Sequence, residues 1–229
     1  MFNWQKLLPL NIQRKHLLKR FSASPLKHYL SNPVPALSQQ VSDAEFLVLD
    51  FETSGLNAKK DHVLSVGYTL IKNNRVTMKN NQYAVIRQQT ELEADNVTIH
   101  QLTDSAIESG EEMRIVFDRL INDMAGRVVV AHNAAIEKNF INAACKKLYG
   151  SEIPIRLIDT LQIEKKRRQR RHQIIKQNQL RLFNLRKEYG LPRYKAHNAL
   201  EDAIATGELF LQQIAYVCGT RRCQLKDLY

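Results

Sequence analysis

The chain has 229 residues, of which 44% are hydrophobic, so it is long and apolar enough for one compact domain with an appendage. This composition excludes a chain that is disordered throughout. The formal net charge of +11 and the pI of about 9.6 favour a polyanionic partner, because clustered Lys and Arg side chains displace counterions from phosphates.

Hydropathy and cysteine usage indicate a soluble protein. No apolar run reaches the roughly 18 residues that a membrane-spanning helix needs, and the chain start shows no secretory signal, so we expect no stable membrane insertion. Cys145, Cys218 and Cys223 form no C-x-x-C pair and lack a histidine at zinc-binding spacing. We interpret them as reduced thiols and expect a cytoplasmic location.

Residues 1–42 differ in composition from the rest of the chain. They contain no Asp or Glu, carry six Lys and Arg residues, and end in a Pro- and Ser-rich stretch around Pro33 and Pro35. We therefore predict a basic N-terminal extension over 1–42 and a single domain over 43–229. The extension can lie on a membrane or serve as an organelle presequence, but a basic helix that packs on the domain or contacts nucleic acid is favoured.

The rest of the chain carries strand patterns first and alternates strands with helices later. Residues 46–49 form an apolar run, 63–71 a second strand, and 72–75 a hairpin turn before Val76; residues 83–86 predict a third strand. Helical periodicity over 112–124 ends at Gly126, before a buried strand. The later elements expected are a strand over 128–131, a helix over 134–149, a short strand over 155–158 and a helix over 199–217. This order predicts an α/β fold with a sheet flanked by helices.

The first chemical signal is the pair Asp50 and Glu52, at the end of the first apolar strand. Alternation along a strand places both carboxylates on one face, with Phe51 on the other. Two such carboxylates repel each other unless a cation neutralises them, and Mg²⁺ or Mn²⁺ prefers oxygen ligands. They are candidate metal ligands, although a strand-end acidic pair on its own is more often simply solvated.

Two later segments share one layout, in which a histidine and an asparagine precede a helix with an early acid. Asn133 is predicted as an N-cap with Glu137 as the fourth helical residue, and Asn198 as an N-cap with Asp202 as the fourth. The residue before an N-cap lies near the fourth helical residue, so His197 is expected beside Asp202. The alternative is two ordinary capped helices whose acids offset the helix dipole.

Taken together, the segments resemble the DEDDh exonucleases, a family that includes the epsilon proofreading subunit of bacterial DNA polymerase III, ribonuclease T and oligoribonuclease. The resemblance covers about residues 45–217. The matching residues, in order, are Asp50-x-Glu52 with Thr53-Ser54-Gly55-Leu56, the segment 99–104, His132-Asn133-Ala134-Ala135-x-Glu137, Asp159-Thr160 and His197-x-Ala199-x-x-Asp202-Ala203. It implies a ribonuclease H-like mixed sheet and a metal-dependent 3'-5' exonuclease that releases nucleoside 5'-monophosphates. The second motif departs from the family, with Glu137 where Asp is usual and Ile136 where Phe is usual.

The resemblance also implies roles at a site for two divalent ions, Mg²⁺ or Mn²⁺. Asp50 would bridge both ions, Glu52 and Asp202 would complete the first ion's ligands, and Glu137 would support the second. His197 would take a proton from the attacking water, since histidine side chains titrate near neutral pH. Glu137 keeps the charge and oxygens of Asp with one more methylene, so we expect it to function with shifted geometry.

By the same resemblance, six residues are expected at the terminal nucleotide: Thr53, Ser54, Leu56, Ile99, His100 and His132. The backbone of Thr53 and Ser54 would meet the terminal sugar, and Leu56, Ile99 and His100 would border its base. Core packing is an equal alternative for Leu56 and Ile99, and a surface position for His100. His132 would approach a phosphate or only fix its loop. Asp159 would support the site from behind or serve as a helix N-cap.

The densest basic run is predicted on a helix after Thr160, and it comprises Lys165, Lys166, Arg167, Arg168, Arg170 and Arg171. A helical run cannot point all one way, so part of it is ordinary solvated surface. The rest is expected to contact phosphates beyond the cleaved nucleotide, in a duplex or a long single strand. This favours DNA as the substrate and leaves RNA open.

Three functions remain for this pattern. A free-standing exonuclease in DNA repair or end processing is favoured. Proofreading beside a polymerase is less favoured, because no long tail like that of the epsilon subunit follows the last helix. An inactive nucleic-acid-binding module of the same fold is the third, and the intact acids and His197 weigh against it.

Overall fold

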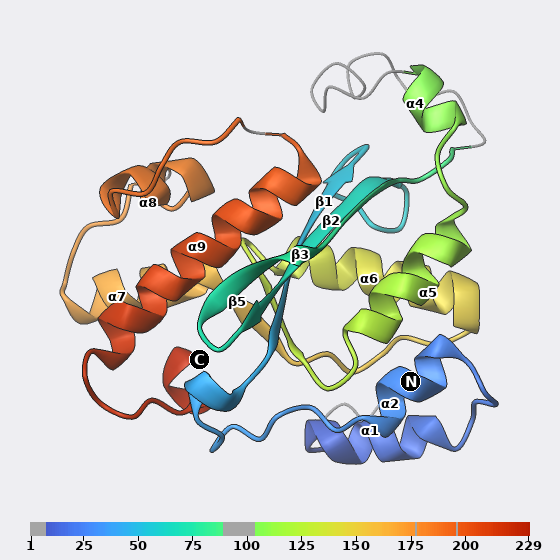
Figure 1. The fold of residues 1–229 in the computed structure, drawn as a ribbon, viewed down its shortest axis with the longest axis horizontal. Coiled ribbons are helices and arrows are strands. Elements are labelled where there is room, and N and C mark those ends of the chain that lie inside the picture. Colours follow the sequence, from blue (N-terminus) through green and yellow to red (C-terminus); the bar gives the residue numbers. More distant parts are fainter. Residues whose placement is uncertain (1–7, 89–103, 177, 196) are drawn as a thin grey trace.

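The computed structural model describes residues 8–88, 104–176, 178–195 and 197–229 (Figure 1). Five strands form one mixed sheet in the order β3-β2-β1-β4-β5. The strands are β1 Phe46–Thr53, β2 Val63–Lys72, β3 Arg75–Val85, β4 Val128–Ala131 and β5 Leu157–Asp159. The pairs β1·β2 and β2·β3 are antiparallel, whereas β1·β4 and β4·β5 are parallel. The predicted mixed α/β sheet is confirmed.

Helices cover both faces of this sheet, with α9 lying across one face and α5 and α6 behind the other (Figure 1). Outside the sheet the described helices are α1 Leu10–Leu18, α2 Pro25–Ser31, α4 Asp104–Glu108, α5 Met113–Asp123, α6 Ala135–Tyr149, α7 Thr160–Arg170, α8 Leu182–Glu188 and α9 Ala199–Cys218. Two short 3-10 helices are also present: Val41–Asp43 precedes β1, and Leu225–Leu228 lies near the C-terminus.

Alternate side chains of β1 point into two different core clusters, one on each face of the sheet. Leu47 and its i+2 neighbours belong to the cluster that contains Phe117 of α5. Phe46 belongs to the other cluster, with its ring centroid 5.0 Å from that of Phe210 in α9. Because side chains alternate with a period of two, Asp50 continues the face that α9 covers. The strand therefore aims its carboxylates toward α9.

The hairpin between β2 and β3 turns at Asn73 and Asn74, with φ of 52° and 56°. Two consecutive positive φ values are typical of a type I′ turn, so the predicted hairpin is confirmed. The separate strand predicted over residues 83–86 is wrong, because β3 runs unbroken from Arg75 to Val85. Its middle carries exposed polar residues on the edge of the sheet, which hid the strand from a hydrophobic pattern.

Helices α1 and α2 pack on the domain. Leu26, Tyr29 and Leu30 of α2 are buried in the core cluster shared with α5. Arg14 of α1 is only 1% exposed, and its guanidinium donates hydrogen bonds to the carbonyls of Tyr29, Asn32 (2.8 Å) and Pro154 (3.3 Å). One basic residue of the extension is therefore an internal anchor rather than a surface charge.

The cysteines only partly follow the prediction. Cys145 is free and buried, but a disulfide joins Cys218 at the end of α9 to Cys223, so the interpretation of all three as reduced thiols is wrong. The sequence showed only a five-residue separation, whereas the turn after α9 brings the two Cα atoms to 5.3 Å. In the parts of the chain described above, no helix is long and apolar enough to cross a membrane.

Candidate functional site

Three carboxylates from two elements meet at the carboxyl end of β1. Asp50 and Glu52 lie on the strand, and Asp202 lies in the first turn of α9. One ligand oxygen from each side chain lies within 4.8 Å of the others. The sequence separated these acids by 150 residues, and the fold brings them together on the face that Asp50 was expected to share with Glu52.

Gly67 of β2 makes this meeting possible. It pairs directly with Asp50 in the sheet, so both positions present the same face to α9. A Cβ built on Gly67 would lie 2.1 Å from the carbonyl carbon of Ala199 and 2.1 Å from the amide nitrogen of Leu200. Only glycine allows the first turn of α9 to lie against the strand, and this contact sets the distance of Asp202 from the sheet. An isolated glycine in a strand pattern was the available signal, and sequence reasoning missed it.

Helix α9 begins as predicted. The Asn198 side chain accepts hydrogen bonds from the amides of Leu200 and Glu201, both at 3.1 Å. His197 has a φ of 69°, and its backbone amide donates to the Asp202 carboxylate at 3.2 Å. The cap and this bond hold the backbone of His197 beside Asp202, where the motif placed it.

The carboxylate cluster is electrostatically unfavourable without a cation. Burial raises the pKa of Asp50 well above its ordinary value, and the charges of Glu137, Asp202 and Glu52 raise it further. Burial likewise raises the pKa of Asp202 to about 7. Its Oδ1 is buried with no hydrogen-bond partner among the described residues. Unpaired buried oxygens and mutually repelling acids are the donor set that a hard divalent cation fits.

Glu137 joins the site from α6, but by a different local structure from the one predicted. Asn133 has a φ of 61° and is not the N-cap; Ala134 precedes α6, which makes Glu137 its third residue. Glu137 is 4% exposed, and among the described residues its Oε2 has no hydrogen-bond partner. Burial raises its pKa to about 8. A buried carboxylate with one unpaired oxygen, whose charge raises the pKa of Asp50, is placed to support a cation.

Asp159 ties the second motif to α7. Its carboxylate accepts from the amide of Leu161 at 2.9 Å as the N-cap of α7, and from the amide of Asn133 at 3.0 Å. The helix-cap interpretation is therefore present in the structure. The same carboxylate also holds the loop before Glu137, which explains why Asn133 leaves its expected cap position.

His132 fixes its loop through both ring nitrogens. Nε2 lies 2.8 Å from the carbonyl oxygen of Leu180, which can only accept, so Nε2 carries the proton and donates. Nδ1 lies 2.8 Å from the hydroxyl of Thr160, which donates to it. Burial lowers the pKa of His132 to about 4. A neutral imidazole with both nitrogens bonded favours the loop-fixing role over the phosphate contact.

His132 is expected to make the fold acid-sensitive. Because its folded-state pKa of about 4 lies below the ordinary 6.5, the unfolded chain binds the proton first as pH falls. Its contribution is complete above about pH 6.5 and declines toward pH 4, by up to roughly 3 kcal/mol. His132→Gln keeps a donor and an acceptor, so urea unfolding of the metal-free protein should lose less stability between pH 7 and 4.5 than wild type. Equal losses would contradict this role.

The loop after β1 is held by its own side chains. Ser54 exchanges two hydrogen bonds with the backbone of His62, both at 2.9 Å, and the Thr53 hydroxyl donates to the carbonyl of Gly55 at 2.7 Å. Leu56 is 77% exposed, which rules out the core-packing alternative for this residue. Of the other residues expected at the terminal nucleotide, Ile99 and His100 lie outside the described residues.

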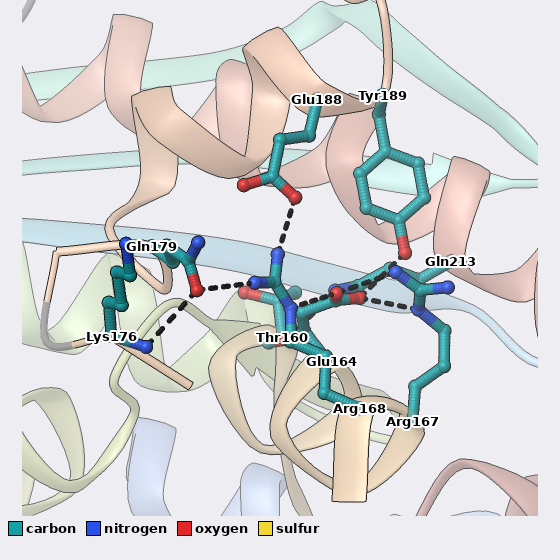
Figure 2. Close-up of polar contacts among 9 residues, drawn as sticks. All are labelled: Thr160, Glu164, Arg167, Arg168, Lys176, Gln179, Glu188, Tyr189 and Gln213. Carbon is teal, nitrogen blue, oxygen red and sulfur yellow. Dashed lines mark hydrogen bonds and ion pairs between the residues drawn. The ribbon is translucent and has the colours of Figure 1, made fainter. Parts of the chain in front are cut away.

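The basic run of α7 does not all face solvent. Figure 2 shows Arg167 and Arg168 pointing toward Glu164, which is fully buried. The Glu164 carboxylate accepts from Arg167 at 2.7 Å, from Arg168 at 2.7 Å and from the Tyr189 hydroxyl at 2.8 Å. Arg168 also pairs with Glu188 of α8. These contacts fasten α7 to α8.

The predicted contact of Arg168 with nucleic acid is therefore wrong. Its side chain is 5% exposed and is already paired with the carboxylates of Glu164 and Glu188. Arg167 is partly buried and bonded to the same Glu164. The remaining four cations of the run, Lys165, Lys166, Arg170 and Arg171, are exposed. Charge was readable from the sequence, but the direction of each side chain depended on partners as distant as Glu188.

A second arginine, missed by sequence reasoning, holds the segment before His197. Arg186 of α8 is 1% exposed and donates to the carbonyl of Pro192 at 2.7 Å and to Glu208 of α9 at 2.8 Å. The Tyr194 hydroxyl donates to the other oxygen of Glu208 at 2.8 Å. This clamp anchors the chain that leads into His197. No spacing motif signals it, since its members lie on three different elements.

Sequence comparison gives the family. A family model described as Exonuclease matches residues 47–210. A PolC-type DNA polymerase III of Thermotoga maritima is 26% identical over 193 residues, which cover 82% of this chain and 14% of that relative. The 3'-5' exonuclease DinG of Staphylococcus aureus is 25% identical over 168 residues, covering 73% of this chain and 18% of that relative. The chain thus spans less than a fifth of the length of these relatives.

Solved structures share the fold at low sequence identity. Escherichia coli exonuclease I in complex with a dA16 oligonucleotide superposes with a TM-score of 0.66 and 15% identity, over 76% of this chain and 41% of that one. Exonuclease X in complex with 5' overhanging duplex DNA gives a TM-score of 0.59 and 19% identity, over 80% and 98%. At this identity the likeness shows the ribonuclease H-like fold alone. With the family model spanning most of the sheet and α9, the chain belongs to the Exonuclease family.

Proposed function

We propose that the chain is a metal-dependent 3'-5' exonuclease that hydrolyses DNA from its 3' end and releases nucleoside 5'-monophosphates, free-standing in DNA repair or end processing. The observation that carries the proposal is the meeting of Asp50, Glu52 and Asp202 within 4.8 Å on a family fold. DNA is favoured over RNA because the similar exonuclease I and exonuclease X structures are complexes with DNA.

The chain's residues divide the work at this site. Asp50, Glu52 and Asp202 would hold divalent cations, Mg²⁺ or Mn²⁺, with Glu137 in support. Bound cations would supply charge neutralisation at the phosphate and a nucleophile derived from water. His197, whose backbone is fixed beside Asp202, would accept the proton of the attacking water. The backbone around Thr53 and Ser54, with the exposed Leu56, would receive the terminal nucleotide.

The similarity to PolC-type polymerases favours a second candidate, proofreading in association with a polymerase. A time course with 5'-labelled single-stranded DNA, duplex DNA and RNA, with Mg²⁺ or Mn²⁺, tests the activity and ranks the substrates. We expect ladders that shorten from the 3' end and stop on addition of a chelator. Internal cuts would overturn the exonuclease proposal, and salt-sensitive binding without any cleavage would favour the inactive binding module.

Glu137 supplies a separate test of the second metal position. Glu137→Gln keeps the size but removes the charge, so cleavage should fall by at least about 10²-fold. Glu137→Asp keeps the charge and shortens the reach by one methylene, so its rate should stay within about tenfold of wild type. Single-turnover rates against metal concentration measure both variants. Activity kept by Glu137→Gln but lost by Glu137→Asp would mean that length, and not charge, decides the role of Glu137.

A further inference from the structure

A large groove lies between α6 and the loop that follows β1. Its volume is about 1570 Å³, and its walls come from residues 56–63 and 86–88 on one side and from one face of α6 on the other. The start of α5 and Glu152 complete the lining. The groove lies outside the carboxylate cluster, and of its lining residues only Leu56 has a role implied by the motifs.

The walls of the groove are strongly basic. Seven Lys and Arg side chains line it against three acids, and one of the acids, Asp61, is bonded to the amide of Asn57 at 2.7 Å. The exposed cations that matter most are Lys59, Lys60, Arg87, Lys138, Lys146 and Lys147. A concave surface with cations on both walls focuses a positive potential and concentrates a polyanion.

The polar side chains on the α6 wall are spaced like the successive phosphates of a nucleic-acid strand. Lys138, Asn142 and Lys146 follow one another at four-residue steps, so they lie along one face of the helix. Each step advances about 6 Å along the axis, which is comparable to the distance between successive phosphates of a nucleic-acid strand. Lysine and asparagine side chains are both common phosphate ligands. This face can therefore meet about three consecutive phosphates.

Two residues that line the groove are close in sequence to residues of the reaction site. Lys138 directly follows Glu137 in α6, and the exposed Leu56 comes two residues after Ser54. By contrast, two of the six cations of the α7 run bind Glu164, and Arg168 is buried. We propose that the strand leading to the 3' end lies in this groove, with its phosphates on Lys138, Lys146 and Lys147. The inference rests on the proposed exonuclease function.

Matched pairs of charge removals test this path. Lys146→Gln/Lys147→Gln removes two exposed charges from the groove, and Lys165→Gln/Lys166→Gln removes two exposed charges from α7. Both pairs and wild type are assayed on a 20-nucleotide single strand and on a dinucleotide, with Mn²⁺. We expect the groove pair to raise KM for the long strand about tenfold, and to lower the salt slope of binding by about 1.4, with dinucleotide cleavage unchanged. The α7 pair should change KM less than threefold.

The outcomes separate the path from the activity. If the α7 pair changes KM and the salt slope as much as the groove pair or more, the path along α6 is overturned, while the exonuclease stands. If wild type cleaves neither substrate, the proposed function fails; binding of the labelled strand, followed by fluorescence anisotropy in chelator, still compares the two surfaces. A groove pair that also loses dinucleotide cleavage would contradict a role restricted to upstream phosphates.

Discussion

Asp202→Asn is expected to lower cleavage of a DNA 3' end by at least about 10³-fold while making the metal-free protein more stable. The amide keeps the shape of the side chain but removes one of three carboxylates that lie within 4.8 Å. Because the folded-state pKa of Asp202 is raised to about 7, the ionised group destabilises the fold at pH 8. Its removal should add about 1 to 3 kcal/mol to the free energy of unfolding.

Two measurements check this pair of effects. Single-turnover cleavage follows the activity, and thermal unfolding at pH 8 with and without Mn²⁺ follows stability. Wild type should gain stability on addition of Mn²⁺, and Asp202→Asn should gain little. Glu201→Gln is the matched control, because Glu201 is an exposed acid in the same turn of α9. Normal cleavage by Asp202→Asn, or an equal loss in Glu201→Gln, would contradict the assignment.

Gly67→Ala is expected to reduce cleavage by at least about 10²-fold, although Gly67 carries no functional group. The added Cβ would meet the backbone of Ala199 and Leu200 at 2.1 Å, and backbone atoms cannot rotate aside. The first turn of α9 must then move away from β1, which separates Asp202 from Asp50. Overpacking of this kind should also cost about 1 to 3 kcal/mol of stability.

Gly207→Ala provides the comparison, since it adds the same methyl group to α9 itself. There the new Cβ would lie 3.5 Å from Val48 and Val76, which is ordinary contact. Removal of a helical glycine should leave cleavage unchanged and stabilise the fold by up to about 1 kcal/mol. The Mn²⁺ affinity of each variant, from calorimetry, tests whether the carboxylates have separated. Tight Mn²⁺ binding by Gly67→Ala would show that α9 does not need this close approach.

Local patterns were sufficient for the parts of the fold that local interactions determine. Alternation placed Asp50 and Glu52 on one face, and the cap at Asn198 fixed the start of α9, because each depends on residues within a single turn or strand. The same kind of reasoning failed at Asn133. Its amide bonds to Asp159, which comes 26 residues later, and this bond replaces the expected cap.

Long-range partners decided what the sequence could not show. The Arg168 side chain belongs to a run that looks like surface, yet Glu164 and Glu188 draw it inward. From the sequence alone, Gly67 only weakens a strand. Its role is apparent only from the first turn of α9, which packs directly against it. In both cases the residue type was visible, but its use depended on an element elsewhere in the chain. Composition therefore overstated the basic surface of α7 and understated the role of β2.

The internal anchor at Arg14 has a consequence for the order in which the chain can fold during translation. Its guanidinium bonds to the carbonyl of Pro154, 140 residues later, and the Tyr29 hydroxyl donates to the same carbonyl. At ordinary elongation rates the ribosome needs on the order of ten seconds to make that stretch. The bonds that Arg14 and Tyr29 make to Pro154 can form only after that interval, whereas the apolar side chains of α2 can pack on α5 once residue 123 has been made.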